Sequence, residues 1–422
     1  MLLEPLTFFD LILACNHFDT ALLSLSTNEI FFAFRKKINQ TKKRKKEKQK
    51  MKKTLISSMA FLVSVMMFTS IAFAGGDGSP DGNPSPFEAS VFTNLDYGLY
   101  WFGNNYNNQK AVKGKYNRYF SESAPTVIYV HGWQNKTTKR MSRECFNYKA
   151  SGAPDMYFAQ AWIDDGWNVG VFYWNQMADE GEVQDAEAKI WTTNGPRKMR
   201  WRRSDGSYRN DGPSESASYL FFQAYRDAMK NYRGDEIRIV GHSLGNQMAV
   251  CVTQHIKEAV QSGQISSQLL PDRVALLDPF YSKGGKDFLG GKWTGEVARG
   301  YVSGLIDDGV LFELYRTSGA SSTGFIGDTN SALTDMTAFT ELKPWYFGWV
   351  EQANKHIAAV WHYFWSYSFS PPSIKGSHDD GASAITADGR IAQLMRSSKK
   401  LVHDQGAWTK TPEDDRMKYV NR

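Results

Sequence analysis

The chain has 422 residues, of which 41% are hydrophobic and 22% charged, a balance typical of a folded globular protein. Its formal charge is +6, but residues 1–74 hold 12 Lys and Arg against 5 Asp and Glu. Without them 38 basic and 39 acidic residues remain, and the formal charge falls to −1. Because no net positive field is then left to attract phosphates, we expect no nucleic-acid partner.

The N-terminal region has the pattern of segments that a mature protein lacks. Residues 51–74 begin with Met51 and two lysines, continue with the apolar run Leu55 to Phe73, and end in Ala72-Phe73-Ala74. This order is typical of a secretory signal peptide, here cleaved after Ala74, and an uncleaved membrane anchor is the alternative. Residues 1–50 resemble neither a signal nor a domain, and we interpret them as an upstream extension translated by mistake. The sequence therefore predicts a secreted protein, periplasmic or extracellular.

The mature chain has three predicted parts. Residues 75–118 begin with a stretch rich in Gly, Pro, Asp and Ser, and we expect a flexible N-terminus followed by edge elements. Residues 119–370 alternate strand and helix patterns, and the polar extension 371–422 is expected to form a peripheral pair of helices. The predicted strands are Thr126–Val130, Val169–Trp174, Ile237–Val240, Val274–Leu277 and Val310–Tyr315, with helices at 214–230 and 244–260. This alternation predicts an α/β protein with a mostly parallel sheet and helices on both faces.

The segment Gly241-His242-Ser243-Leu244-Gly245 lies between a predicted strand and a predicted helix. A strand, tight turn and helix in this order lift a serine hydroxyl out of the sheet edge as a nucleophile. The serine backbone is strained there, and a Cβ at either flanking position would collide with the crossing strand and helix. Ser243 is therefore the candidate nucleophile, and a Gly-rich turn in an ordinary βα unit is the alternative.

A serine hydroxyl is a weak nucleophile unless an imidazole takes its proton and a carboxylate orients that imidazole. In this kind of fold the three residues follow the chain order Ser, Asp, His. Asp278 directly follows a buried strand, so its carboxylate is expected at the same sheet edge as Ser243. Asp307 and Asp308, in an acidic turn, are the rival acids.

Two downstream histidines compete for the role of base. His356 is expected to end a loop just before the helical run 357–369, whereas His362 is expected well inside that helix. Because a catalytic imidazole on a loop can swing between serine and leaving group, we favour His356 and keep His362 as the alternative. His131 and His242 flank the predicted strand ends and are candidates for structural roles.

The tetrahedral intermediate of acyl transfer carries an oxyanion that requires preorganised N–H donors. Leu244, directly after the nucleophile, supplies one candidate amide. Trp133, in the turn His131-Gly132-Trp133 after the first predicted strand, supplies the other. No H-x-x-x-H or C-x-x-C spacing is present, so we expect neither a metal nor a cofactor.

Three motifs together resemble the pancreatic-lipase-type branch of the α/β-hydrolase superfamily, over about residues 124–366. They are Val127 to Trp133, Gly241 to Gly245, and Leu277-Asp278-Pro279. The resemblance implies an α/β-hydrolase fold, a Ser-His-Asp triad and a mobile apolar lid. The long connection from Phe280 to Lys355 carries the aromatic cluster Trp345-Tyr346-Phe347-Trp349. We expect that cluster either to form an acyl-chain cleft or lid, or to fill the core of an inserted subdomain.

Members of that family carry a tyrosine seven and a serine ten residues after the catalytic histidine. His356 reproduces this spacing with Tyr363 and Ser366, and His362 does not. The chain departs from the family at Ala358, where relatives have an arginine, and it lacks their ladder of disulfides.

The sequence as a whole predicts a secreted serine hydrolase that cleaves carboxylic esters through an acyl-enzyme, with lipid esters favoured as substrates. A phospholipase A1, a soluble esterase or a peptidase on the same triad are alternatives, because a fold does not set the substrate. A hydrolase-fold binding protein without activity is the alternative from another class. A lipid or ester substrate is the expected partner, at a lipid–water interface if the substrate is a lipid, and no protein partner is predicted.

Overall fold

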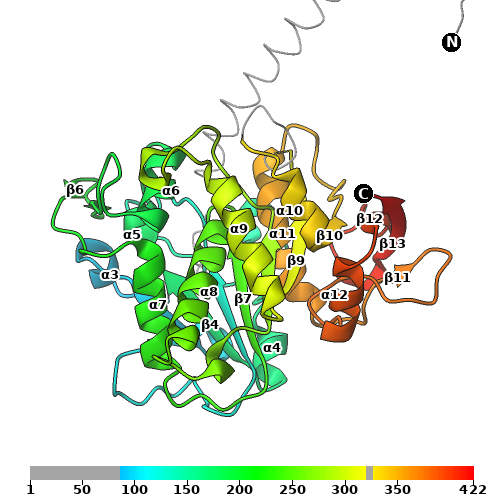
Figure 1. Cartoon of the computed structure of the whole chain (residues 1–422), viewed down its shortest axis with the longest axis horizontal. Coiled ribbons are helices and arrows are strands. Elements are labelled where there is room, and N and C mark those ends of the chain that lie inside the picture. Colours follow the sequence, from blue (N-terminus) through cyan, green and yellow to red (C-terminus); the bar gives the residue numbers. More distant parts are fainter. Residues whose placement is uncertain (1–85, 320–326) are drawn as a thin grey trace, which may run out of the picture. The chain divides into compact units, whose positions relative to one another are not determined.

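The chain forms a large mixed β-sheet, which this computed structural model describes with its helices for residues 86–319 and 327–422 (Figure 1). The expected upstream extension, residues 1–50, and the signal peptide, residues 51–74, lie outside the described residues. Among the helices that are described, none combines the length and apolar character needed to cross a membrane.

The sheet contains eleven strands in this part of the chain, in the order β11-β13-β12-β10-β9-β8-β7-β3-β4-β1-β2. The run from β4 to β12 is parallel, β1 and β2 are antiparallel at one edge, and β13 is antiparallel to β12 near the other. The mostly parallel sheet predicted from the sequence is confirmed. The strands are β1 Gly98–Phe102, β2 Asn108–Lys110, β3 Thr126–Val130, β4 Asn168–Tyr173, β7 Ile237–His242, β8 Arg273–Leu277, β9 Leu311–Arg316, β10 Ala338–Glu341, β11 Ser373–Ile374, β12 Lys399–Gln405 and β13 Arg416–Asn421, with a separate hairpin of β5 Trp201–Arg202 and β6 Tyr208–Arg209.

Helices cover both faces of the sheet. They are α3 Ser90–Thr93, α4 Gln160–Asp164, α5 Asn175–Ala178, α6 Val183–Trp191, α7 Ala217–Ala228, α8 Gly245–Gln261, α9 Thr294–Asp307, α10 Ser331–Met336, α11 Gln352–Ser366 and α12 Asp388–Met395. Figure 1 shows α7, α8 and α9 side by side on one face. Their apolar side chains share a core with Ile128 and Val130 of β3, while α11 shares the opposite core with Val127 and Tyr129 of the same strand. Because successive strand residues point to opposite faces, a fully apolar strand can serve two cores. The arrangement is the α/β-hydrolase fold.

The carboxyl ends of three neighbouring parallel strands bring the candidate site residues to one edge of the sheet. Strand β7 ends at His242, directly before Ser243, and β8 ends at Leu277, directly before Asp278. Strand β3, which pairs with β7, ends at Val130 and is followed by the loop that contains Trp133. Ligands and catalytic groups of parallel α/β sheets gather at this edge.

The prediction of two peripheral helices in residues 371–422 is wrong. This segment contains one α-helix, α12, a short 3-10 helix at Pro412–Asp414, and three strands that extend the sheet beyond β10. Strand β12 pairs in parallel with β10 through Leu401 and Val402, which are buried. An exposed sheet edge favours pairing with a further strand. This pairing outweighs the low strand propensity of the polar tail.

Two buried arginines of the central strands also hold the C-terminal segment. Arg238 of β7 donates from Nη1 to the carbonyl oxygen of Ala384 at 2.5 Å. Arg273 of β8 donates to the carbonyl oxygens of Ser383 at 3.0 Å and Thr386 at 2.6 Å. The tail is therefore bound to the sheet by side chains as well as by strand pairing.

Candidate active site

Ser243 lies on the sharp turn between β7 and α8, with a left-handed φ of 56° that is strained for a residue with a side chain. The two flanking glycines have no room for a Cβ. One added to Gly241 would lie 2.4 Å from the carbonyl oxygen of Gly245, and one added to Gly245 would lie 2.2 Å from that of Val130. The steric reason inferred for the G-x-S-x-G spacing is confirmed.

A side chain that the sequence analysis missed joins this turn to the neighbouring strand. Asn246 donates from Nδ2 to the carbonyl oxygens of Ser243 and Leu277, both at 2.9 Å. The amide of Ser243 also donates to the carbonyl oxygen of Leu277 at 3.1 Å. These bonds hold the residue before Asp278 against the serine turn. A polar residue in the first turn of an otherwise apolar helix is the signal that could have found Asn246.

Asp278 and His356 form a buried pair. His356 Nδ1 lies 2.5 Å from Asp278 Oδ2, and the two side chains are 2% and 0% exposed. Asp278 Oδ1 accepts hydrogen bonds from the amides of Thr317 at 3.0 Å and Ser318 at 3.3 Å, and Oδ2 accepts one from the Ser318 hydroxyl. Burial by itself would raise the pKa of Asp278, but the hydrogen bond and charge of His356 and the donors of Thr317 and Ser318 lower it.

Thr317 and Ser318 directly follow β9, which ends at Arg316, one residue after the predicted strand end at Tyr315. The rule that identified Asp278 applies equally to them, because they also occupy the carboxyl end of a parallel strand. The sequence analysis did not apply this rule to Thr317 and Ser318 and so missed both residues.

His356 does not end a loop, as the sequence predicted, but lies inside α11, which begins at Gln352. The helix starts earlier because the residues before His356 continue its amphipathic pattern and lack a helix-breaking glycine or proline. The imidazole is consequently held on a rigid element and moves only by side-chain rotation. Its orientation by Asp278 is thus stricter than a loop would give.

The proton on His356 can be placed from its partner. In the neutral imidazole Nδ1 carries the proton because it faces a carboxylate, and Nε2 has the lone pair. Nε2 is buried and makes no hydrogen bond within the part of the chain that the structure describes. Ser243 is 5% exposed, so only a small part of it reaches solvent, and its hydroxyl is not bonded to Nε2 here. In the absence of substrate such a bond is often long, and it tightens in the substrate complex.

The two amides proposed for the oxyanion lie beside Ser243. A Cβ added to Gly132 would be 2.7 Å from Ser243 Cβ and 3.0 Å from the Leu244 nitrogen, so the turn containing Trp133 touches the serine turn. Neither the Trp133 amide nor the Leu244 amide donates a hydrogen bond to any described residue. The Trp133 indole is fixed by a 2.7 Å hydrogen bond from Nε1 to the carbonyl oxygen of Glu180.

His131 and His242 are close to the site but stay uncharged. Burial lowers the pKa of His131 to about 3, and its ring stacks on Trp174 at 5.9 Å between centroids. Burial also lowers the pKa of His242 well below its ordinary value, with a smaller contribution from the charge of His356. Neither imidazole takes up a proton in the neutral range.

The rival acid and base residues lie elsewhere. His362 Nε2 is 2.7 Å from Asp415 Oδ2, on a different side of α11 from His356. Asp307 is the last residue of α9, and Asp308 forms an ion pair with Lys257 at 2.8 Å. Of the candidate pairs, the structure brings together only Asp278 and His356 in the described part of the chain.

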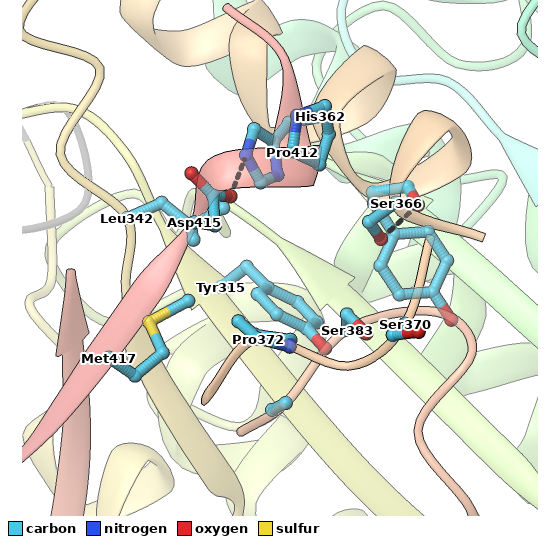
Figure 2. Close-up of a pocket in the computed structure, with 12 residues that line it drawn as sticks. Tyr315, Leu342, His362, Ser366, Ser370, Pro372, Ser383, Pro412, Asp415 and Met417 are labelled. Atoms are coloured by element: carbon cyan, nitrogen blue, oxygen red, sulfur yellow. Dashed lines mark hydrogen bonds and ion pairs between the residues drawn. The ribbon is translucent and has the colours of Figure 1, made fainter. Parts of the chain in front are cut away.

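Figure 2 shows a cavity beside α11, with the Asp415 carboxylate turned toward His362. Its lining includes Tyr315, Ser383 and Met417 but none of Ser243, Asp278 and His356. The space inside is about 10 Å³, close to what one water molecule requires. It is therefore no candidate for the substrate site.

His362, His403 and Asp415 have the residue types of a metal site, with ligand atoms within 4.8 Å of one another. However, His403 Nδ1 accepts a hydrogen bond from the Lys343 amide at 3.1 Å. The proton of a neutral His403 is then on Nε2, the atom that lies 3.1 Å from Asp415 Oδ2. A metal-binding histidine needs the opposite arrangement, in which the second nitrogen donates. The cluster fits a buried carboxylate held by two imidazoles.

The aromatic cluster expected to form a lid, a cleft or a core is divided between surface and core. Phe347 is 6% exposed and packs against Tyr346 at 4.9 Å between centroids. Trp345 and Trp349 are 45% and 65% exposed. Trp345 also packs against the exposed Trp408 of the C-terminal segment at 4.8 Å.

No protein-family model and no curated protein matches the sequence. Solved structures that are similar in fold include an acylaminoacyl peptidase of Pyrococcus horikoshii, with 12% identity, a TM-score of 0.27, and 52% of this chain and 32% of that one covered. EstE1, a thermostable carboxylesterase cloned from a metagenomic library, has 14% identity, a TM-score of 0.19, and 39% and 40% covered. A predicted CIB-like hydrolase of Thermoplasma acidophilum has 11% identity, a TM-score of 0.27, and 64% of this chain and 97% of that one covered.

The chain spans about a third to a half of the length of the first solved structures that it matches. At these identities and TM-scores the likeness carries no argument about substrate or reaction. The order and direction of the strands, with Ser243 on the turn between β7 and α8, define the α/β-hydrolase fold of this chain.

Proposed function

We propose that this chain is a serine hydrolase that cleaves carboxylic esters, with esters of lipids as the favoured substrates. One observation carries the proposal. Asp278 and His356 form a 2.5 Å pair at the sheet edge where β7 ends in the strained turn of Ser243. Strain and a buried, paired titratable group at one place are characteristic of a catalytic site.

The proposed reaction proceeds through an acyl-enzyme. His356 Nε2 takes the proton of Ser243 Oγ as this oxygen attacks the ester carbonyl, and Asp278 stabilises the imidazolium. The amides of Trp133 and Leu244 bind the oxyanion of the tetrahedral intermediate. His356 then returns the proton to the leaving alcohol, and a water molecule activated by the same imidazole hydrolyses the acyl-enzyme.

The preference for lipid esters rests on two observations. The motifs around Trp133, Ser243 and Asp278 resemble the pancreatic-lipase-type branch, and we propose a relationship to it. The exposed indoles of Trp345, Trp349 and Trp408 are of the kind that lies favourably at a boundary between water and an apolar phase. We therefore propose action at a lipid–water interface.

Secretion is proposed from the charged start, apolar run and small-residue end of residues 51–74. Mass spectrometry of the exported protein is expected to find Gly75 as the first residue. A native protein that contains a peptide from before Met51 would show that residues 1–50 are translated and retained.

Turnover of p-nitrophenyl esters of graded acyl length tests the proposed function. We expect hydrolysis by the wild type, a rate that rises for long chains above their solubility limit, and no turnover by Ser243→Ala. Ser267→Ala, at an exposed serine, is the matched control and should keep full activity. A preference for short chains indicates a soluble esterase, and release of one fatty acid from a phospholipid indicates a phospholipase A1. No turnover by the wild type would identify a binding protein and overturn the proposal.

A further inference from the structure

Glu144 is a buried acid that the proposed reaction does not use. It is 3% exposed and forms no ion pair with any residue in the described ranges. Its carboxylate accepts hydrogen bonds from Tyr129 Oη at 2.6 Å, Gln134 Nε2 at 2.6 Å and Tyr148 Oη at 3.4 Å. All three donors are neutral. Burying a carboxylate with neutral partners alone is costly, so stability by itself gives little reason for an acid here.

One of these donors belongs to the turn that supplies the Trp133 amide. Gln134 directly follows Trp133, and its own amide donates to the carbonyl oxygen of Ala178 at 3.2 Å. On the other side of Trp133, Gly132 lies against the Cβ of Ser243. The residues on both sides of Trp133 are therefore held in place. Gly132 contacts the serine turn, and the side chain of Gln134 is bound to Glu144.

The second strong donor fixes Glu144 to the sheet. Tyr129 belongs to β3 and is fully buried in the core that also contains α11. Glu144 is thus bound both to Tyr129 within β3 and to Gln134 in the turn that follows this strand. A bond to an ionised acceptor is shorter and about twice as strong as one between neutral groups.

The pKa of Glu144 is raised above its ordinary value, and a charge on His356 acts against that rise. Burial raises the pKa of Glu144, while the hydrogen bonds of Tyr129, Gln134 and Tyr148 and the charge of His356 act in the opposite direction. The positive charge that His356 gains during the reaction therefore strengthens the hold of Glu144 on Gln134.

We propose that Glu144 is a positioning residue of the oxyanion site. It holds the Gln134 side chain and thereby keeps the Trp133 amide directed at the oxygen that becomes negative in the transition state. The inference rests on the proposed ester hydrolysis and adds to it a residue outside the triad. Because the effect is on the transition state, it should appear in kcat and leave KM almost unchanged.

Glu144→Gln in the full chain tests this inference. A Gln side chain has one acceptor oxygen and no charge, and its NH2 group can donate to Tyr129 Oη, so Gln134 is left with a neutral and weaker acceptor. We expect kcat on a soluble p-nitrophenyl ester to fall about 10- to 100-fold, less than the loss of a whole oxyanion donor, with KM within about twofold. Affinity for an alkyl boronic acid, which forms a tetrahedral adduct with the serine, should fall by the same factor as kcat.

Gln134→Ala removes the same contact from the other side and serves if Glu144→Gln folds poorly. It should reproduce the loss in kcat and boronic acid affinity, and the double variant should be no worse than the more impaired single variant. Glu341→Gln, which alters a partly exposed acid paired with Lys400 at the end of β10, is the matched control and should leave both values unchanged.

The experiment distinguishes a failure of this inference from a failure of the proposed function. Folded Glu144→Gln and Gln134→Ala variants with kcat and boronic acid affinity within twofold of an active wild type would overturn the role of Glu144. Equal rises in KM without loss of kcat would also overturn it. A wild type without esterase activity would instead overturn the proposed function.

Discussion

His242 Nε2 donates a hydrogen bond to the backbone carbonyl oxygen of His356 at 3.1 Å, and the two rings pack at 4.4 Å between centroids. The residue before the candidate nucleophile is thereby bound to the residue that carries the candidate base. The neutral imidazole of His242 thus fixes the position of the turn after β7 relative to helix α11.

His242→Phe keeps the ring but removes this donor. We expect the free energy of unfolding to fall by about 1 kcal/mol, as for one hydrogen bond, and kcat to fall about tenfold because Ser243 and His356 lose their mutual alignment. Since burial keeps the pKa of His242 well below its ordinary value, the acidic limb of the pH–rate profile should not move. Urea unfolding and kcat/KM between pH 5 and pH 8 measure both effects. A shift of the acidic limb would show that His242 itself titrates.

Gly132→Ala tests the contact between the turn of Trp133 and the serine. The new Cβ would lie 2.7 Å from Ser243 Cβ, so the two turns must separate. We expect a loss of about 1–3 kcal/mol in stability and a fall in kcat of at least tenfold. Gly300→Ala, at an exposed site of α9 with no atom within 4 Å of the new Cβ, is the control. It should raise stability by about 0.5–1 kcal/mol without changing kcat. Equal kcat in the two variants would contradict the proposed arrangement.

Asp278→Asn keeps the shape of the acid and removes its charge. The His356 imidazole would then adopt the wrong tautomer, and kcat should fall about 10³- to 10⁴-fold. In the wild type the pKa of Asp278 is lowered, so its pairing stabilises the fold above about pH 4 and is lost as the pH falls through the lowered value. The stability difference between wild type and variant should therefore shrink in acid. Denaturant unfolding at several pH values follows it, and a difference that grows in acid would contradict the pairing.

Asp415→Asn tests the buried cluster that joins α11 to the C-terminal strands. Burial alone would raise the pKa of Asp415, but the charges and hydrogen bonds of His362 and His403 lower it to about 2. The folded-state value lies below the unfolded value near 3.9, so the stabilisation is complete at pH 7 and is lost between about pH 4 and pH 2. We expect a loss of about 3 kcal/mol at pH 7 with little change in kcat. Thermal unfolding of both proteins at pH 7 and pH 2.5 checks this; an equal loss at the two pH values would contradict it.

The parts of the site that could be predicted from the sequence are those set by local sterics or by strand ends. Gly241 and Gly245 could be predicted because a Cβ at either position would collide at the sharp turn, with Gly245 itself or with Val130 of the neighbouring strand. Asp278 could be predicted because it directly follows an apolar strand. The structure places Asp278 beside His356, the histidine that local reasoning favoured. The catalytic roles of these residues stay predictions until they are tested.

The parts that could not be predicted depend on contacts distant in the chain. The strands after residue 371 follow from pairing with the sheet, which composition does not report. The partner of His362 is Asp415, more than fifty residues away. Glu144 accepts hydrogen bonds from both Gln134 and Tyr129 because its loop returns to β3. Short-range patterns contain no information on such pairs.

Labelling with a fluorophosphonate probe, followed by intact-mass analysis, tests most directly whether Ser243 is an activated nucleophile. We predict one adduct on the wild type, located on Ser243 by peptide mapping. Ser243→Ala should give no adduct, His356→Ala should label at least 100-fold more slowly, and His362→Ala should label at the wild-type rate. An unlabelled wild type, an adduct that survives Ser243→Ala, or a His362→Ala variant that is silent while His356→Ala still reacts would contradict the account.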